Sequence, residues 1–440
     1  MNIFQPLSVA ATGVLVCAVL TGCRRQSATP DAVFLAGAAR VDITPPWQTH
    51  PSPLEGYGER EGRPAQGVHD PIFARALVVE ASNQTAVVVA TDLCFIPSDL
   101  KSDVMSRLEN TGLRDDQLLL TATHNHAGTS TMAMWRSNVF ANPRIGVFDE
   151  FLLTFTTGKI SEAVIAALDD VAPALFGVTQ MDLPGLNKNR RRGDSVVDSS
   201  MAVAKIVRPD GSPVAVLVNY TAHGTIIDEF VMQISGGWIG MMAADIEESV
   251  GGICLFTNGA EGDQAPRGWH GKGSDRFEQA QWYADQVSPY VLKALSEVEL
   301  SGDAVVETSQ RWVTLPPHKA SPSFRESAGT EFGVDDQGLQ QMIETLFADI
   351  APVMRTKIGG LVIISVPGEM IGELGLQIKG VDSRPNGDVV VVAGLANSYI
   401  GYILSAEEYA QGGYESAVSF YGPALADSLL PVMLEMAQGR

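Results

Sequence analysis

The feature that most constrains this chain is a series of short apolar runs, each followed by polar residues able to do chemistry. Three of the seven histidines stand directly behind such runs: His124 and His126 follow QLLLTAT, and His223 follows VAVLVNYTA. Similar runs lead into Asp263, Glu369, Asn397, Tyr399 and Tyr402. Ligand sites in α/β proteins gather beyond the carboxyl ends of strands, on loops held by a rigid sheet. We therefore expect these side chains to meet at strand ends.

Short β-branched runs alternate with helical patterns, which predicts an α/β fold with a mixed sheet, flanking helices and a site at the C-terminal ends of strands. Strands are expected at 86–90, 117–121, 214–219, 253–256, 361–366 and 389–393. Helices are expected at 98–109, 150–168, 276–297 and 335–350, the last behind Asp335 and Asp336 as capping candidates. Residues 316–334 combine prolines, a glycine and polar residues, and are expected to be the least regular interior stretch.

Composition excludes several classes of protein. A hydrophobic content of 45% with 18% charged residues is ordinary for a folded globule and unlike a disordered chain. A net charge of -21 repels phosphate backbones, so nucleic-acid binding is not expected. Four cysteines in 440 residues cannot build a disulfide scaffold. No composition shift marks a second domain, so 33–440 is predicted to be a single domain.

The N-terminus has the pattern of an export signal. Residues 7–22 are uncharged and apolar but short for a membrane span, and they end in Leu20-Thr21-Gly22-Cys23, which resembles the lipobox of bacterial lipoproteins. That resemblance implies a signal peptide at 1–22, lipidation of Cys23 and a tether at 23–32. The protein would then be exported and lipid-anchored in the bacterial cell envelope, on the periplasmic or outer-membrane face. No Lys or Arg precedes the apolar run, and a plain signal peptide or a short buried helix remains the alternative.

The histidines and a carboxylate together suggest a metal site. In an extended segment, His124 and His126 would share one face because strand side chains repeat every two residues. With His223 from another strand and Glu369, they form a plausible first shell for catalytic zinc. Each residue alone has a structural alternative: the His-x-His pair could be incidental, His223 a hydrogen-bonded strand-end histidine, and Glu369 a carboxylate at a helix N-terminus.

An ordered set of landmarks then resembles the catalytic domain of the neutral/alkaline, non-lysosomal ceramidases, over roughly residues 36–430. No single landmark is distinctive, but their order along the chain is. They include Gly56-Tyr57-Gly58, Thr123-His124-Asn125-His126-Ala127-Gly128, Asn187-Lys188-Asn189-Arg190, Ala222-His223-Gly224, Val366-Pro367-Gly368-Glu369, Asn397-Ser398-Tyr399 and Tyr421-Gly422-Pro423.

The resemblance implies a zinc-dependent amidohydrolase in a short, single-domain form. It implies His124, His223, Glu369 and Tyr402 as the zinc ligands. It further implies that His126, Arg190 and Tyr414 line the substrate or polarise the scissile carbonyl. From the residues alone, Arg190 could instead belong to a solvated run with Arg191 and Arg192, and Tyr414 could be an ordinary packed aromatic residue.

One departure from the family pattern affects the mechanism. The ceramidase motif carries a serine nucleophile in Gly-Asp-x-Ser-Pro, whereas this chain has Ala265 in Gly262-Asp263-Gln264-Ala265-Pro266. A metal-activated water needs no serine, so the expected reaction is hydrolysis of an N-acyl amide by that water. His126 or Asp263 would relay its proton, and Arg190 or Tyr414 would stabilise the oxyanion.

The expected substrate is a small or lipid-like N-acyl molecule, and the expected cofactor is Zn²⁺. Two alternatives stay open. The chain could be a zinc hydrolase of another acylated or sugar-derived molecule. It could also be a lipoprotein that binds a lipid or glycan without turnover.

Overall fold

The computed structural model describes residue 1 and residues 34–193, 195–381 and 387–440. The expected signal peptide apart from residue 1, the lipidation site Cys23 and the whole of the expected tether lie outside these described residues. Residues 32–440 group into one compact unit.

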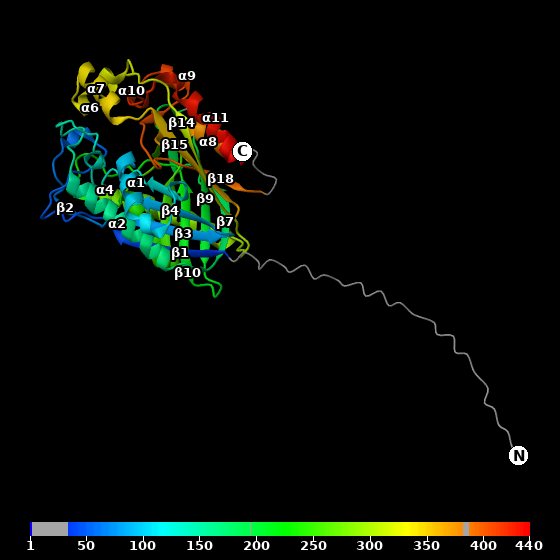
Figure 1. Ribbon diagram of the computed structural model, residues 1–440. Coiled ribbons are helices and arrows are strands. Elements are labelled where there is room, and N and C mark those ends of the chain that lie inside the picture. Colours follow the sequence, from blue (N-terminus) through cyan, green and yellow to red (C-terminus); the bar gives the residue numbers. More distant parts are fainter. Residues whose placement is uncertain (2–33, 194, 382–386) are drawn as a thin grey trace. The chain divides into compact units, whose positions relative to one another are not determined.

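Three mixed sheets form the centre of this unit (Figure 1). The first has the strand order β5-β4-β3-β1-β6, the second β12-β10-β9-β7 and the third β14-β15-β16-β18. The first comprises β1 (Leu35–Asp42), β3 (Phe73–Ala81), β4 (Gln84–Thr91), β5 (Leu118–Ala122) and β6 (Ala172–Pro173). The second comprises β7 (Leu175–Asp182), β9 (Ser200–Val207), β10 (Pro213–Tyr220) and β12 (Ile253–Asn258). The third comprises β14 (Val306–Thr314), β15 (Ile350–Ile358), β16 (Leu361–Ser365) and β18 (Val389–Ala393).

Each sheet contains one parallel pair, and these pairs matter for the site. They are β4 with β5, β10 with β12, and β16 with β18. Parallel neighbours end at the same edge of a sheet, so the loops that follow them emerge together. The expectation of a mixed sheet with flanking helices and polar loops at strand ends is confirmed, although the strands divide among three sheets.

The inner faces of the three sheets share one core. Leu77 of β3, Leu217 of β10 and Ile363 of β16 belong to the same buried apolar cluster, each fully or almost fully buried. Such β-branched and leucine-rich strands are apolar on both faces, because helices cover the outer faces.

The helices cover the sheets from outside. Helix α2 (Glu150–Asp169) packs on β1 and β3, and α3 (Gly237–Val250) with α4 (Arg276–Glu297) covers the second sheet. Helices α8 (Gly372–Lys379) and α11 (Leu425–Ala437) cover the third. Among the described helices, α2 alone has the length and apolar composition of a membrane span, and its packing is that of a core helix. The remaining helices are α1 (Ser98–Arg107), α5 (Phe324–Ser327), α6 (Gly329–Phe332), α7 (Asp336–Leu346), α9 (Ala406–Ala410) and α10 (Tyr414–Ala417).

Short elements connect the sheets near the loops of interest. The two-stranded pairs are β2 (Gly67–Val68) with β11 (Gln233–Ile234), β8 (Asn187–Asn189) with β13 (Gln264–Pro266), and β17 (Glu369–Met370) with β19 (Tyr402–Ile403). Single 3₁₀ turns are η1 (Gly58–Arg60), η2 (Glu109–Thr111), η3 (Asp115–Gln117), η4 (Met132–Met134) and η5 (Gly422–Ala424).

One predicted helix is shorter than expected. Helix α7 begins behind Asp335, whose side chain accepts a hydrogen bond from the Gly338 N–H, but it ends at Leu346. Phe347 is extended, and Ile350 opens strand β15 rather than closing the helix. Residues 316–334, expected to be irregular, contain the one-turn helices α5 and α6.

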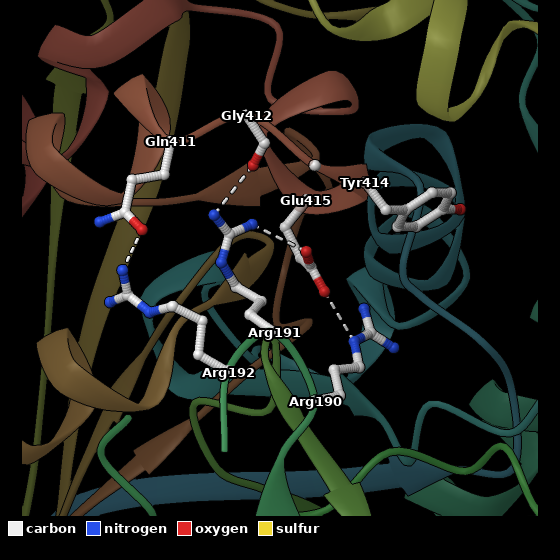
Figure 2. A pocket seen from close by; sticks show the side chains of 8 residues that line it. Arg190, Arg191, Arg192, Gln411, Gly412, Tyr414 and Glu415 are labelled. Carbon is white, nitrogen blue, oxygen red and sulfur yellow. Dashed lines mark hydrogen bonds and ion pairs between the residues drawn. The ribbon is translucent and has the colours of Figure 1, made fainter. Parts of the chain in front are cut away.

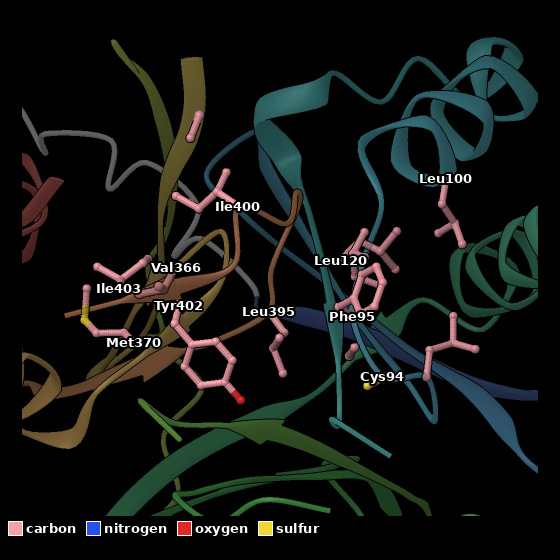
Figure 3. Packing of buried hydrophobic residues seen from close by; sticks show 14 of the residues in the cluster. Cys94, Phe95, Leu100, Leu120, Val366, Met370, Leu395, Ile400, Tyr402 and Ile403 are labelled. Carbon is pink, nitrogen blue, oxygen red and sulfur yellow. The ribbon is translucent and has the colours of Figure 1, made fainter. Parts of the chain in front are cut away.

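A buried apolar cluster joins the end of the chain to its first third. Figure 3 shows Val366, Met370, Tyr402 and Ile403 on one side of this cluster and Cys94, Phe95 and Leu120 on the other. The carboxyl-terminal segments are thereby fixed against the loop after β4.

Candidate metal centre

His124 lies just after β5 in an unusual backbone conformation. Its φ is 66°, the left-handed region that non-glycine residues seldom adopt, and such strain concentrates at functional sites. Asn125 forms a parallel bridge to Gly224, where an added Cβ would lie 2.1 Å from the His124 carbonyl oxygen. The expectation that a plain extended segment aligns His124 with His126 is therefore wrong in its backbone geometry. The two rings nevertheless meet, with centroids 4.6 Å apart.

The two predicted histidine ligands are oriented by backbone carbonyls. His124 Nδ1 lies 2.9 Å from the Cys94 carbonyl oxygen, and His223 Nδ1 lies 3.0 Å from that of Gln264. A carbonyl only accepts hydrogen bonds, so each Nδ1 must carry the proton. Each Nε2 is then left with its lone pair free, which is the tautomer that a metal-binding histidine needs. The buried Trp238 indole donates to the His223 carbonyl at 3.0 Å and fixes its backbone.

Glu369 and Tyr402 face each other across the parallel pair β17–β19. Tyr399 donates its hydroxyl to Glu369 Oε1 at 2.7 Å. The other oxygen, Oε2, is buried and has no hydrogen-bond partner. One carboxylate oxygen is therefore directed at both imidazoles.

The donor atoms of these four residues fit a zinc ion. Glu369 Oε2 lies 3.2 Å from His124 Nε2 and 3.3 Å from His223 Nε2, and the Tyr402 hydroxyl lies 3.4 Å from His223 Nε2. Four ligands held tetrahedrally at about 2.0–2.1 Å from zinc are about 3.3–3.4 Å apart. The spacing, the nitrogen and oxygen donors and the unpartnered Oε2 all match that requirement. The structure thus brings the four predicted ligands together.

His126 contacts this cluster through His124. Its Nε2 is 3.2 Å from His124 Nε2, while its Nδ1 is buried without a hydrogen-bond partner. Burial first, and then the neighbouring His124 and His223, hold the pKa of His126 well below its usual range. The ring is therefore neutral at pH 7.

Arg190 contacts Tyr402, one of the predicted ligands, and Glu415. Its Nη2 donates to the Tyr402 hydroxyl at 2.8 Å, and its Nε donates to Glu415 at 2.8 Å. Burial alone would lower the pKa of Arg190, but Tyr402, Glu415 and Glu369 raise it, so the guanidinium stays charged. A cation in this position favours the anionic form of the Tyr402 oxygen.

The neighbouring arginines form an ion-pair network, so the interpretation of 190–192 as a solvated run is wrong. Arg191 is almost fully buried and pairs with Glu408 and Glu415, while Arg192 is more exposed and pairs with Glu408. Figure 2 shows Arg190, Arg191 and Arg192 lined up against Gln411, Gly412 and Glu415, with Tyr414 at one end. The network holds the loop after β8 against the segment that follows α9.

The side chain of Asp263, expected to relay a proton, instead accepts hydrogen bonds from three other residues. Its Oδ1 accepts from the Gly372 N–H at 2.8 Å and from Gln264 at 2.7 Å, and its Oδ2 accepts from Asn189 at 2.6 Å. It is not among the residues that line the cavity over His124, Glu369 and Tyr402. Its carbonyl accepts from the Arg190 N–H at 2.7 Å, so Asp263 positions the arginine loop instead of reaching the cavity.

A cavity opens over the cluster and is largely apolar away from it. Tyr414 lines it and donates its hydroxyl to Glu331 at 3.4 Å, so Tyr414 is not an ordinary packed aromatic residue. The apolar lining consists of Phe95, Met132, Ile145, Phe332, Met342, Leu346, Phe347, Val418 and Phe420. Convergent polar groups at one end of an apolar cavity are typical of a small-molecule site.

Sequence reasoning did not assign three of the groups that complete the site. Tyr399, which orients Glu369, is signalled only by its place in the Asn397–Tyr402 pattern. The Cys94 carbonyl, which orients His124, follows β4 and carries no side-chain signature. Glu331 lies in the stretch expected to be irregular, and only the fold brings it to the cavity.

Comparison with known proteins places this arrangement in a family. The family model described as neutral/alkaline non-lysosomal ceramidase, N-terminal, matches residues 34–267 and 329–430. Neutral ceramidase B of Dictyostelium discoideum is 24% identical over 93% of this chain and 72% of its own length. Neutral ceramidase of Pseudomonas aeruginosa is 22% identical over 97% of this chain and 75% of its own. The crystal structure of neutral ceramidase from Pseudomonas aeruginosa superposes with a TM-score of 0.76, at 21% identity, over 93% of this chain and 74% of that one.

Proposed function

The chain belongs to the neutral/alkaline non-lysosomal ceramidase family, and from that premise we propose that it is a zinc-dependent hydrolase that cleaves an N-acyl amide bond. The observation that carries the proposal is the convergence of the His124, His223 and Glu369 donor atoms, with the Tyr402 hydroxyl 3.4 Å from His223 Nε2. A protein that only bound a ligand would have little need of these donors and of a buried carboxylate oxygen without a hydrogen-bond partner.

The residues around the cluster suit hydrolysis of an amide. A zinc ion held there would act as a Lewis acid on the carbonyl and lower the pKa of a coordinated water to about 7. His126, neutral and with an unpartnered ring nitrogen, would take up a proton beside His124. The Tyr414 hydroxyl and the charged Arg190 would stabilise negative charge on the carbonyl oxygen. The apolar lining would hold the acyl chain away from water.

We expect the purified protein to contain about one equivalent of zinc and to hydrolyse N-acyl substrates only when zinc is present. Metal analysis by plasma mass spectrometry gives the stoichiometry. A screen of N-acyl lipids, N-acyl amino acids and N-acylated amino sugars gives the reaction. A folded protein without zinc affinity would refute the proposal. Turnover confined to the sugar substrates would favour the alternative of a zinc hydrolase acting on a sugar-derived molecule.

Restoring the family serine is expected to bring no gain. Ala265 lies on β13, with its backbone paired to Lys188, and it is not among the residues that line the cavity over His124, Glu369 and Tyr402. The Ala265→Ser variant should therefore keep kcat/KM within about threefold of the wild-type value on any N-acyl substrate, since a small substitution that adds no group to the cavity lining has a small effect. The measurement is steady-state hydrolysis of the best substrate from the screen. A gain of tenfold or more would show that a hydroxyl nucleophile completes the site, and would favour a non-catalytic binding role for the natural chain.

A further inference from the structure

Glu331 lines the same cavity from a different part of the chain. It belongs to the one-turn helix α6 and receives the Tyr414 hydroxyl on its Oε1. The Gly56-Tyr57-Gly58 turn runs between it and the metal cluster. A Cβ on Gly56 would lie 2.3 Å from His126 Nδ1, and one on Gly58 would lie 2.3 Å from the Glu331 carbonyl oxygen. Two residues of chain span at most about 7 Å, so α6 is held close to His126.

Glu331 differs from the other carboxylates that line this cavity. Glu55 Oε2 is saturated by Ser130, Thr131 and the Met132 N–H. Glu369 accepts a hydrogen bond from Tyr399 on Oε1, and its Oε2 contacts the imidazoles of His124 and His223. Glu331, by contrast, has one described side-chain donor, at the long distance of 3.4 Å. It is thus the cavity carboxylate with hydrogen-bonding capacity to spare.

The surroundings of Glu331 leave its charge sensitive to pH. Burial first, and then Glu59 of η1, raise its pKa to about 7, while the Gly58 N–H, Tyr414 of α10 and Arg190 oppose that rise. The loop that contacts α6 contributes Arg144, which donates to the Thr330 carbonyl and pairs with Glu61 rather than with Glu331.

We propose that Glu331 is a specificity-determining residue that accepts a hydrogen bond from a donor, a hydroxyl or an ammonium, on the amine half of the substrate. The inference rests on the proposed amide hydrolysis. Burying a carboxylate against an alkyl chain is unfavourable. The acyl half is therefore assigned to the apolar lining around Phe347 and Phe420. The amine half is assigned to the end of the cavity where Glu331 and Tyr414 lie.

The test compares two substrates of equal size in the zinc-loaded full chain. N-dodecanoyl-ethanolamine carries a hydroxyl where N-dodecanoyl-propylamine carries a methyl group. A hydrogen bond to a charged acceptor discriminates by about 10-fold or more, so the wild type should prefer the ethanolamide by that ratio of kcat/KM. In Glu331→Gln the ratio should fall about tenfold, with the zinc content unchanged. The matched control, Glu326→Gln on the exposed side of α5, should keep the wild-type ratio.

A pH profile separates this role from a structural one. As the pH falls through about 7, Glu331 takes up a proton and loses its charge, so the wild-type ratio should decline, whereas the Gln variant should show a flat ratio. Equal ratios in the wild type and in Glu331→Gln, with both substrates turned over, would overturn the inference and leave the hydrolase proposal intact. If neither amide is turned over, dissociation constants of the two amides, measured by calorimetry in the wild type and in Glu331→Gln, give the same ratio and decide the role of Glu331, while the hydrolase proposal is decided by the zinc analysis and the wider substrate screen.

Discussion

The Glu369→Ala variant is expected to lose zinc and hydrolysis together. Its Oε2 is the atom that approaches both His124 Nε2 and His223 Nε2, so its removal leaves two buried imidazoles without their shared anion. We expect zinc content below about one tenth of an equivalent and a loss of kcat/KM on the order of 10³-fold, about 4 kcal/mol of transition-state stabilisation. Plasma mass spectrometry and steady-state kinetics measure the two effects. His223→Ala should behave in the same way.

The matched control is Glu373→Ala, which removes an exposed carboxylate from α8, four residues further along. It should keep both zinc and activity. If Glu369→Ala retained a full equivalent of zinc with unchanged affinity, the assignment of this carboxylate as a ligand would be wrong. Circular dichroism of each variant distinguishes loss of metal from loss of fold.

The second large effect, on zinc affinity and on kcat, is expected from the Arg190→Met variant. The change removes the cation that contacts the Tyr402 oxygen at 2.8 Å but keeps an unbranched side chain of similar length. Because burial strongly favours the neutral phenol of Tyr402, and Arg190 opposes this, the variant should bind zinc more weakly, by about 10–100-fold, as loss of an outer-shell partner does. The kcat should fall on the order of 10²-fold, because a donor to developing negative charge is lost.

Arg192→Met is the matched control, since Arg192 pairs with Glu408 and has no described contact with Tyr402. Its zinc affinity should stay within about threefold of the wild-type value, because exposed ion pairs are weak. Competition with a chromogenic chelator measures both affinities. A drop in kcat for Arg190→Met at full zinc affinity would assign Arg190 to the substrate alone, as the sequence resemblance first suggested.

Much of the scaffold could be predicted from residue patterns, because local signals and the fold agree there. The run at 389–393 and the helix at 276–297 have the predicted bounds, since turn residues and capping groups delimit both. The predicted helix at 335–350 is longer than α7, because Ile350 continues the helical spacing of apolar residues. In the structure, Ile350 instead pairs with Thr314 in the third sheet. Periodicity cannot distinguish the two uses of one isoleucine.

The residues of the site could be predicted from the sequence, but their arrangement in space could not. His124, His223 and Glu369 follow apolar strands, and that placement is visible in the sequence. The left-handed φ of His124 is not visible in the sequence, and neither is the close approach of Gly224 from a distant loop. The hydrogen bonds of Asp263 are not visible in the sequence either, because its three donors come from Asn189, Gln264 and Gly372.

The pairing of β17 with β19 has a consequence for how the site comes into being. His124 belongs to the first third of the chain, whereas Tyr402 belongs to its last tenth and reaches the cluster only when β19 aligns with Glu369. A chain emerging from its amino end therefore has no complete donor set until nearly all of it has been made. Binding to the native state alone adds stability, about 4 kcal/mol when free ligand is 1,000 times its Kd. Zinc would bind late, to a protein whose architecture is already assembled, and would join the first third of the chain to its last tenth.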